Sequence, residues 1–486
     1  MRRPMTKKVL AAVTASAMMM SVAACGDTTS TSTVASTETP ASTETTETSK
    51  EEVTSVEEEE VSPYTVLTDE NGNVYDLGGV EIIIRDWWSD PDAEPTNEYQ
   101  ETQQEWREWC METYNFTIKQ EAISDWSSAP ADFVDYATTG GDEYYAFVVR
   151  EDAAITSAMA SGLMYDLSTL DCLDFTQDKF TRNKLNEQYS KGGATYAMYA
   201  GYSEGRTGVY FNKRVLTEAG IDPESIYDMQ ADGTWTWDKF DELMGICQRD
   251  TDNDGVDDIY GLTLNEGNMT TEAIFSNNGS YIGLDEDGNY YYNLESAETL
   301  EALEWVVEMY AKYDNHDPEG ANWDYYQEEF KSGVVAFLVD DEYCANNGNF
   351  LADMEDEIGF VMFPKGPQAT DYVNVWSNNP VVIPACYDAE KAWKIAFAWN
   401  LYTDQPAGYE DYMDLSDQRA GALDTRAVDE TLVMMREKGT VAYHGLIPNL
   451  SLGSDFVWGI GWYTTVSESV EAIRDTWKAY VDEANQ

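Results

Sequence analysis

The chain has 486 residues, of which 91 are acidic and 29 are basic, so its formal net charge is −62. A protein this negative repels the phosphates of nucleic acid and of anionic lipid headgroups, and we exclude both as partners bound by surface charge. With only two histidines, the sequence also offers little material for a histidine-rich zinc site or for a serine or cysteine catalytic triad.

The N-terminus carries an export signal. A basic flank within residues 1–8 precedes an apolar run at 9–24 that ends in the small residues of VAAC, at 22–25. This run is short for a membrane span and is typical of a cleaved signal, so we predict a signal peptide over residues 1–24 rather than a transmembrane anchor. The VAAC sequence resembles a lipobox. That resemblance implies that Cys25 becomes the lipid-modified first residue of the mature protein.

Residues 26–62 consist mainly of Thr, Ser and Glu, contain no aromatic residue, and include an acidic run at 57–60. Such a composition cannot bury enough apolar surface to form a core. As a flexible coil, a segment of this length spans about 35 Å. We therefore predict a lipidated, disordered tether over residues 25–63.

The chain from residue 64 to 486 is too long for one ordinary hydrophobic core and predicts two lobes. Its first part alternates strand and helix patterns, with a further helix capped by Asp152. The predicted strands are 81–86, 116–119 and 144–149, and the predicted helices between them are 96–113 and 132–138. This alternation is typical of an α/β fold with a parallel sheet.

Residues 207–262 hold the clearest local signals. A strand at 209–211 leads into a helix that Asn212 begins and Gly220 ends. Thr236 is the predicted N-cap of a second helix, and Trp235 and Phe240 are placed as the two partners of a hydrophobic staple. The inner face of that helix follows the spacing of three and four residues, through Phe240, Leu243, Met244 and Cys247.

Three stretches of this region, VYFNKRVLTEAGIDP, TWTWDKF and DTDNDGVDDIYGL, resemble the extracellular solute-binding proteins, family 1, of bacterial ABC importers. GLMYDLS at 162–168 resembles the same family, and the resemblance runs from about Val80 to the C-terminus. It implies a two-lobed, periplasmic-binding-protein-like type II fold with hinge crossings. It also implies a carbohydrate ligand, with an oligosaccharide expected, an ABC permease as partner, and binding without catalysis.

The family pattern also sets the expected lobes. Residues 64–205 plus 334–380 are assigned to the first lobe, and 206–333 plus 381–486 to the second. In this assignment the apolar run VVAFLVDD at 334–341 is a buried strand that returns to the first lobe. The chain would cross between lobes near 199–206 and near 378–384. C-terminal helices are predicted at 391–401 and 466–482.

Ligands of open α/β sheets bind beyond the carboxyl ends of the strands, and in this sequence those ends and the crossings are rich in aromatic and carboxylate residues. Flat aromatic rings cover the apolar face of a sugar, while carboxylates and amides bind its hydroxyl groups. For any single tryptophan, filling the core is an equally good interpretation, and we interpret Trp235 and Trp237 as structural. The predicted ligand-binding residues are Trp87, Trp88, Asp90, Tyr202, Asp340, Asp341, Tyr343, Trp376, Asn378, Trp458 and Trp462.

An acidic loop suggests calcium. Asp250, Asp252 and Asp254 match loop positions 1, 3 and 5 of an EF-hand, with Asp258 at position 9, but Gly261 stands where the bidentate glutamate belongs. The two interpretations are a structural Ca²⁺ ion and a solvated Asp/Asn/Gly turn. The sequence indicates no required cofactor.

Two other function classes stay open at this stage: a surface module that binds peptides or mediates adhesion, and an extracellular glycosidase, which also uses aromatics and paired carboxylates. The five cysteines after Cys25 include no CxxC pair, and we interpret Cys110 and Cys247 as small core residues. The expected location is the extracellular face of the cell membrane, through the lipid anchor.

Overall fold

A computed structural model describes residues 64–313, 322, 324–377 and 379–486. The contacts within the chain separate residues 66–486 as one compact unit, and the fold described below is that of this unit. The signal peptide, the tether, Cys25 and Asn378 lie outside the described residues. Every helix within the described ranges is too short or too polar to cross a membrane.

The first of two main sheets has the strand order β13-β3-β1-β2. Strands β1 (Val80–Asp86), β2 (Phe116–Ala122) and β3 (Tyr144–Val148) are parallel, and the short β13 (Val381–Val382) pairs antiparallel with β3 at the edge. The predicted strands at 81–86, 116–119 and 144–149 are thereby confirmed.

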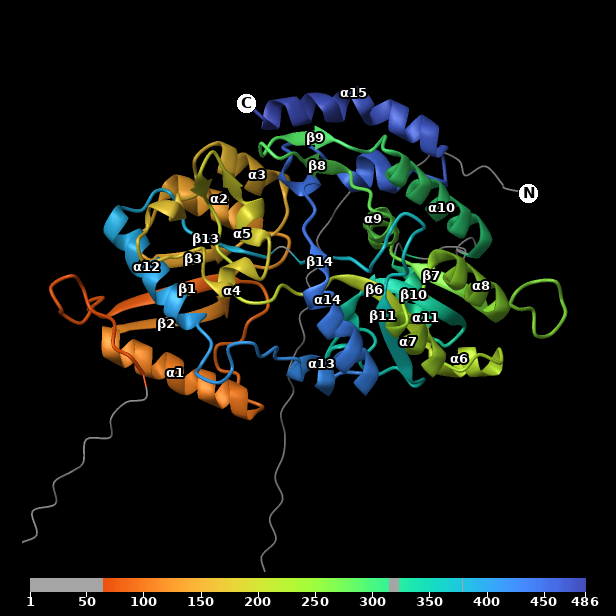
Figure 1. Cartoon of the computed structure of the whole chain (residues 1–486), viewed down its shortest axis with the longest axis horizontal. Coiled ribbons are helices and arrows are strands. Elements are labelled where there is room, and N and C mark those ends of the chain that lie inside the picture. The colour runs from red at the N-terminus through yellow and green to blue at the C-terminus, as the bar shows by residue number, and fades with distance from the viewer. Residues whose placement is uncertain (1–63, 314–321, 323, 378) are drawn as a thin grey trace, which may run out of the picture. The chain divides into compact units, whose positions relative to one another are not determined.

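Four helices flank this sheet in Figure 1: α1 (Glu98–Tyr114), α2 (Ala129–Thr139), α3 (Ala153–Ala160) and α12 (Ala389–Tyr402). Asp152 caps α3 as predicted, because its carboxylate accepts the N–H of Ala154. The sheet and α12 share a core that contains Ile82, Ile84 and Ile395. The shorter elements that follow α3 are η1 (Leu167–Thr169), α4 (Asp178–Thr181), α5 (Leu185–Gln188), β4 (Ser190–Lys191) and β5 (Ala194–Thr195).

The second sheet has the order β11-β6-β10-β7 and lies to the right in Figure 1. Its strands are β6 (Thr207–Asn212), β7 (Tyr260–Leu264), β10 (Val335–Asp341) and β11 (Ile358–Met362). Strand β10 is central, antiparallel to β6 and parallel to β7, and all of its seven residues are buried. A strand covered on both faces reads as a continuous apolar run, which is how this segment appears in the sequence.

Helices from two parts of the chain surround the second sheet. The helices of this part of the chain are α6 (Lys213–Glu218), α7 (Glu224–Ala231), α8 (Trp237–Cys247), α9 (Glu266–Ser276), α10 (Ala297–Tyr313), α11 (Tyr325–Lys331), α13 (Ser416–Ala420), α14 (Val433–Glu437) and α15 (Val466–Ala484). Thr236 caps α8 through the N–H of Lys239, and the rings of Trp235 and Phe240 are 5.3 Å apart, so the predicted cap and staple are confirmed.

The remaining short elements of this part are β8 (Ile282–Leu284), β9 (Tyr290–Tyr292), η2 (Glu342–Ala345), β12 (Asn374–Val375), η3 (Ala427–Leu432), β14 (Gly439–Thr440), η4 (His444–Leu446) and η5 (Gly453–Val457). Helix α15 packs against β9, and its N-cap Thr465 forms a capping box with Glu468. The two main sheets have separate cores, which confirms the predicted two-lobed α/β class.

The predicted division of the chain between the lobes is wrong in its later half. Strand β10 does not return to the first sheet, because Phe337 pairs with Phe211 of β6 and Val339 with Leu264 of β7. Conversely, β13 and α12 belong to the first sheet and its core, where Figure 1 shows the late, blue α12 among early, orange elements. The apolar run at 334–341 predicts a buried strand, but its hydrophobicity carries no information about which sheet it enters.

Crossing segments connect the two sheets where the sequence places them. Residues 198–207 lead from the first sheet into β6, and residues 374–381 lead from β12 back to β13. Isolated bridges pair the two segments, joining Met198 to Val381 and Gly205 to Trp376. A third segment follows, because β14 pairs in parallel with β12. The hinge predicted near 199–206 and 378–384 is therefore a bundle of adjacent backbone segments.

Candidate functional site

Because β1, β2 and β3 are parallel, their carboxyl ends meet at one edge of the first sheet. Trp87 and Trp88 follow β1, with ring centroids 4.9 Å apart and nearly perpendicular planes, and Trp88 is 53% exposed. The turn that presents them is fixed by the buried Asp86, whose carboxylate accepts the N–H of Ser89 at 3.2 Å and the Gln120 amide at 2.8 Å. This edge therefore offers an aromatic surface on a rigid support.

Sequence reasoning missed two residues at the same edge. Trp126 follows β2 and is 58% exposed, and Arg150 follows β3 with its guanidinium carbon 4.0 Å from the centroid of the Trp126 ring. Arg150 Nε also donates to the Trp126 carbonyl at 3.0 Å, and its guanidinium lies 3.3 Å from Asp152. This cation–π contact orients the indole. Applying the strand-end rule to β2 and β3, as well as to β1, would have found both residues.

The equivalent edge of the second sheet is polar and buried. Asp341, at the end of β10, accepts a hydrogen bond from the Thr207 hydroxyl at 2.8 Å and pairs with Arg206 Nε at 3.0 Å. The Asn268 amide of α9 donates to Asp341 at 3.0 Å and to Asp340 at 3.1 Å. The structure thus brings together the predicted Asp340 and Asp341 with three polar partners that the sequence did not single out.

Burial shifts the acid–base behaviour of this edge. Burial, reinforced by the charge of Asp341, raises the pKa of Asp340 well above its ordinary value. Burial likewise raises the pKa of Glu342 to about 7, although Arg436, 3.7 Å away, acts in the opposite direction. The pKa of the fully buried Glu272 is also raised well above its ordinary value. Near neutral pH these carboxyl groups can therefore hold protons and donate hydrogen bonds.

Glu272 and Glu342 also connect the edge to the crossing segments. Glu272 Oε1 accepts the N–H of Val375, in β12, at 3.1 Å. The second oxygen of each of these two carboxyl groups has no hydrogen-bond partner within the described part of the chain. A protonated carboxyl group tolerates such a position better than a charged one.

The other predicted ligand-binding residues differ in exposure. Asp90 is exposed and accepts the N–H of Asp92, and the half-exposed Tyr343 ring lies 5.8 Å from the guanidinium carbon of Arg206. Tyr202 is partly buried, with its ring 4.9 Å from the guanidinium carbon of Arg182.

The three remaining tryptophans behave differently from one another. Trp458 is 61% exposed, whereas Trp462 stacks on Tyr310 with centroids 5.5 Å apart. Trp376 is buried, packs with Leu185 and Val441, and donates its indole N–H to the Met435 carbonyl at 3.0 Å. Its ring therefore lies inside the hinge bundle and not on an open surface. Trp235 and Trp237 are buried, as interpreted from the sequence.

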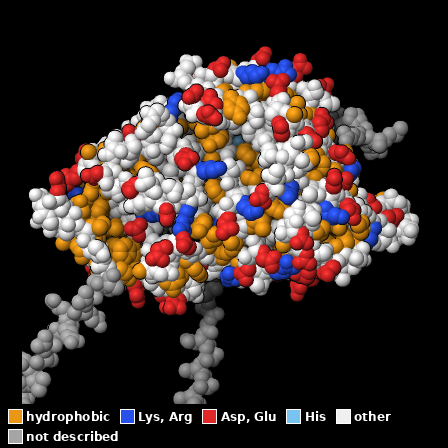
Figure 2. Space-filling view, viewed as in Figure 1, with side chains coloured by type: hydrophobic (Ala, Val, Ile, Leu, Met, Phe, Trp, Pro, Cys, Tyr) orange, Lys and Arg blue, Asp and Glu red, His pale blue; other side chains and the backbone are white. Residues whose placement is uncertain are grey.

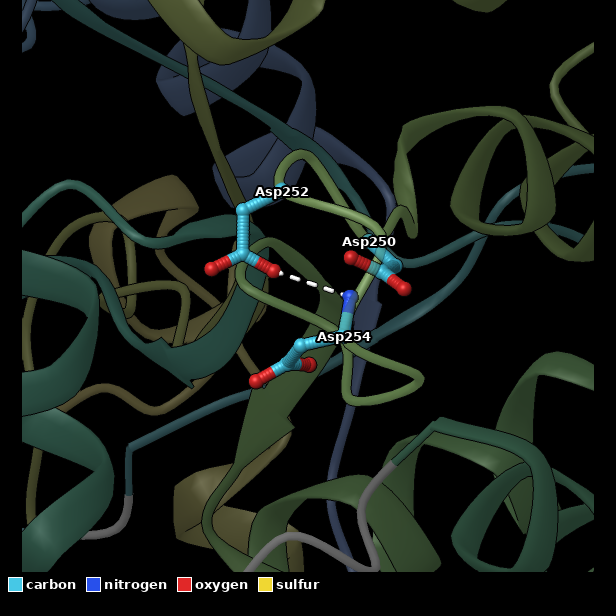
Figure 3. A group of neighbouring side chains, drawn as sticks. All are labelled: Asp250, Asp252 and Asp254. Carbon is cyan, nitrogen blue, oxygen red and sulfur yellow. Dashed lines mark hydrogen bonds between the residues drawn. The ribbon is translucent and has the colours of Figure 1, made fainter.

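Figure 3 shows the acidic loop after α8, where carboxylate oxygens of Asp250, Asp252 and Asp254 lie within 4.8 Å of one another. Asp250 also accepts the N–H groups of Asn253 at 2.6 Å and Gly255 at 2.8 Å. Three converging carboxylates fit an oxygen-liganded cation such as Ca²⁺. Asp258, the predicted fourth ligand, lies outside this group and accepts hydrogen bonds from Thr251 instead.

All five cysteines that the structure describes are free thiols. Burial raises the pKa of Cys110 and of Cys247 to about 12, so both thiols stay protonated and unreactive near neutral pH. This agrees with their interpretation as core residues.

Residues 119–399, more than half of the chain, match the sequence profile of the bacterial extracellular solute-binding proteins. The chain belongs to this family of binding proteins. Comparison with curated protein sequences gave no match.

Solved structures of binding proteins share the fold. The cyclic α-maltosyl-1,6-maltose binding protein of Arthrobacter globiformis superposes with a TM-score of 0.58 at 16% identity, over 84% of this chain and 100% of that one. UgpB of Mycobacterium tuberculosis, in complex with glycerophosphocholine, gives 0.54 at 18% identity, over 82% and 98%. An ABC transporter solute-binding protein of Thermotoga lettingae, bound to α-D-tagatose, gives 0.53 at 16% identity, over 84% and 99%.

Proposed function

We propose that the chain is the substrate-binding lipoprotein of a bacterial ABC importer and that it captures a carbohydrate between its two lobes for delivery to a membrane permease. The observation that carries the proposal is the pairing of an exposed aromatic edge, on the first sheet, with a hydrogen-bonding edge on the second, joined by the crossing segments. Several structural relatives bind sugars, which supports this ligand class. Binding without chemical conversion follows the family.

Each edge would contact a different part of the sugar. The indoles of Trp88 and Trp126 are flat, exposed and firmly supported, and they suit the apolar face of a pyranose ring. Tyr343 and Arg206, partly exposed beside Asp341, suit its hydroxyl groups. Hinge bending at the crossing segments would bring both edges onto one ligand.

A thermal-shift screen tests the ligand class. Mono- and oligosaccharides are compared with peptides and with glycerophosphodiesters, at matched concentrations. A ligand that binds only the folded protein, at 100 times its Kd, adds about 2.7 kcal/mol of stability. We expect a sugar to raise the melting temperature. If only peptides do so, the peptide-binding alternative replaces the carbohydrate assignment, and release of product from a shifted glycoside would favour the glycosidase alternative.

The lipid anchor is a separate part of the proposal and rests on the VAAC sequence that ends in Cys25. A thioether-linked lipid at this position would hold the protein on the outer face of the cell membrane, with residues 26–63 as the tether. Mass spectrometry of the mature N-terminus tests it. We expect a lipid-modified cysteine, and release of the Cys25→Ala variant from the membrane fraction; an unmodified N-terminus at another residue contradicts the anchor.

We also propose a structural Ca²⁺ ion held by Asp250, Asp252 and Asp254. A bound cation would offset the repulsion among the three carboxylates, which sit beyond the C-terminal end of α8 where negative charge is unfavourable. We expect Ca²⁺ to raise the melting temperature relative to chelator, and the Asp252→Asn variant to lose the difference. Equal melting temperatures in the two conditions would leave the loop as a solvated turn.

A further inference from the structure

A groove of about 670 Å³ lies on the second lobe, between the first turn of α8, one face of α10 and the segment that follows β11. It is separate from the two sheet edges described above and shares none of their residues. Two tryptophans, Trp237 and Trp305, line it together with acidic side chains of α8 and α10.

The aromatic part of the groove is rigid. The rings of Trp237 and Trp305 stack with centroids 4.3 Å apart and planes within 11° of parallel. Trp237 is buried and its indole N–H donates to Ser276 Oγ at 3.3 Å, while the Trp305 ring stands edge-on to Phe363. Trp305 itself remains partly exposed. Binding to this indole therefore requires little ordering of the protein.

The charged part of the groove is acidic on both walls. Glu301, Glu304 and Glu308 follow one another along α10 at helical spacing, and Asp238 faces the groove from the first turn of α8. Glu301 is held by the amide of Asn277 at 3.0 Å, and Glu308 pairs with Lys312 at 2.6 Å. Asp238 and Glu304 form no ion pair with another described residue.

We propose that this groove docks a basic protein segment through an arginine side chain. A guanidinium group is planar, stacks on an indole face and forms paired hydrogen bonds with carboxylates. In this groove Trp305 supplies an indole, and Asp238 and Glu304 supply carboxylates. The lining contains four acidic side chains and one lysine, Lys365, so the charge complementarity favours a cationic occupant over a neutral one. This inference goes beyond the proposed function and does not depend on it.

The test uses a capped Gly-Arg-Gly-Arg-Gly peptide and the same peptide with citrulline at both arginine positions. Citrulline keeps the shape of the arginine side chain but removes its charge. Binding to the full mature chain is followed by the indole N–H signal of Trp305 in NMR spectra, assigned with the Trp305→Phe variant. We expect the arginine peptide to shift this signal and the citrulline peptide to bind at least about tenfold more weakly, since charge-assisted hydrogen bonds are roughly twice as strong as neutral ones.

Isosteric variants distinguish binding in the groove from nonspecific attraction of a basic peptide to an acidic protein. Asp238→Asn combined with Glu304→Gln should weaken the arginine peptide about tenfold or more, whereas Glu242→Gln, an exposed change on α8 outside the groove, should leave its affinity unchanged. Equal binding of the two peptides, or equal loss in both variants, overturns the proposal. A shift of the Trp305 signal by a neutral oligosaccharide, without one from the arginine peptide, would instead assign the groove to sugars.

Discussion

The carboxyl edges of the two sheets are built on opposite principles. On the first sheet, side chains at the strand ends are large, aromatic and exposed, as in Trp88 and Trp126. On the second sheet three consecutive residues, Asp340, Asp341 and Glu342, are ionisable and buried. Figure 2 shows acidic, basic and hydrophobic side chains interspersed over one face of the molecule, so surface colour alone does not reveal this contrast.

This difference indicates that residues of the first edge contact the ligand, whereas residues of the second edge position the backbone around the site. An exposed indole contributes little to the stability of the free protein and is available to a ligand. A buried carboxylate with several hydrogen bonds fixes the backbone around it, so its main contribution is to the stability of the folded protein. We therefore expect substitutions at the first edge to act on binding, and substitutions at the second edge and in the hinge bundle to act on folding. The predictions below test this division.

The largest effect is expected at Trp376. Its ring is buried between the crossing segments, so Trp376→Ala should lower the free energy of unfolding by about 3 to 5 kcal/mol through the cavity that it leaves. Denaturant unfolding of the unliganded protein measures this. The matched control is Trp458→Ala, at a residue that is 61% exposed, which should leave stability nearly unchanged. Similar stability in both variants would show that burial does not distinguish the two residues.

The next effect is expected at Asp341. The Asp341→Ala variant leaves Arg206 without its partner and removes the acceptor of the Thr207 hydroxyl, so the free energy of unfolding should fall by about 2 kcal/mol. Asp341→Asn, which keeps an acceptor oxygen, should lose less. The same unfolding measurement applies. If the Asp341→Ala variant is as stable as the wild-type protein, this carboxylate does not stabilise the fold, and a role in ligand contact would be favoured.

Substitutions at the edge of the first sheet should weaken ligand binding and leave folding stability nearly unchanged. Trp88→Ala and Trp126→Ala should each weaken sugar binding by about 1 to 3 kcal/mol while the melting temperature of the free protein changes little, because both rings are more than half exposed. Calorimetric titration with a sugar found in the thermal-shift screen measures the affinity. Unchanged affinity in both variants would remove the aromatic edge from the binding site.

A smaller effect is expected from pH. The pKa of Glu342 is raised to about 7 in the folded protein, against about 4 for an unfolded glutamate, so between these values the folded state binds more protons. This contribution to stability is fully present below about pH 4 and is lost as the pH rises through 7. Melting temperatures should therefore fall from about pH 5 to pH 8, and less steeply in Glu342→Gln. Equal slopes would contradict a shifted Glu342.

Local features were predictable from the sequence because they depend on neighbouring residues. The caps at Asp152 and Thr236, the staple of Trp235 and Phe240, and the βαβ alternation require only short-range patterns. The sheet that β10 joins depends on pairing with β6 and β7, segments more than seventy residues away, and apolar runs do not encode their partners.

The candidate site was predictable only in part for the same reason. The strand-end rule found Trp88, Asp340 and Asp341, but not the crossing-segment residue Arg206, whose role depends on its ion pair with Asp341. Nor can a sequence distinguish an exposed tryptophan such as Trp458 from a buried one such as Trp376, because the two differ in tertiary packing and not in a local pattern.

The central claim, that the two edges close on a carbohydrate, is tested most directly by small-angle X-ray scattering of the mature domain with and without a bound sugar. We expect the radius of gyration to fall on saturation with that sugar, and to stay at the unliganded value in the Trp88→Ala, Trp126→Ala double variant at the same sugar concentration. A sugar that raises the melting temperature of the wild-type protein but leaves its radius of gyration unchanged would contradict closure between the lobes.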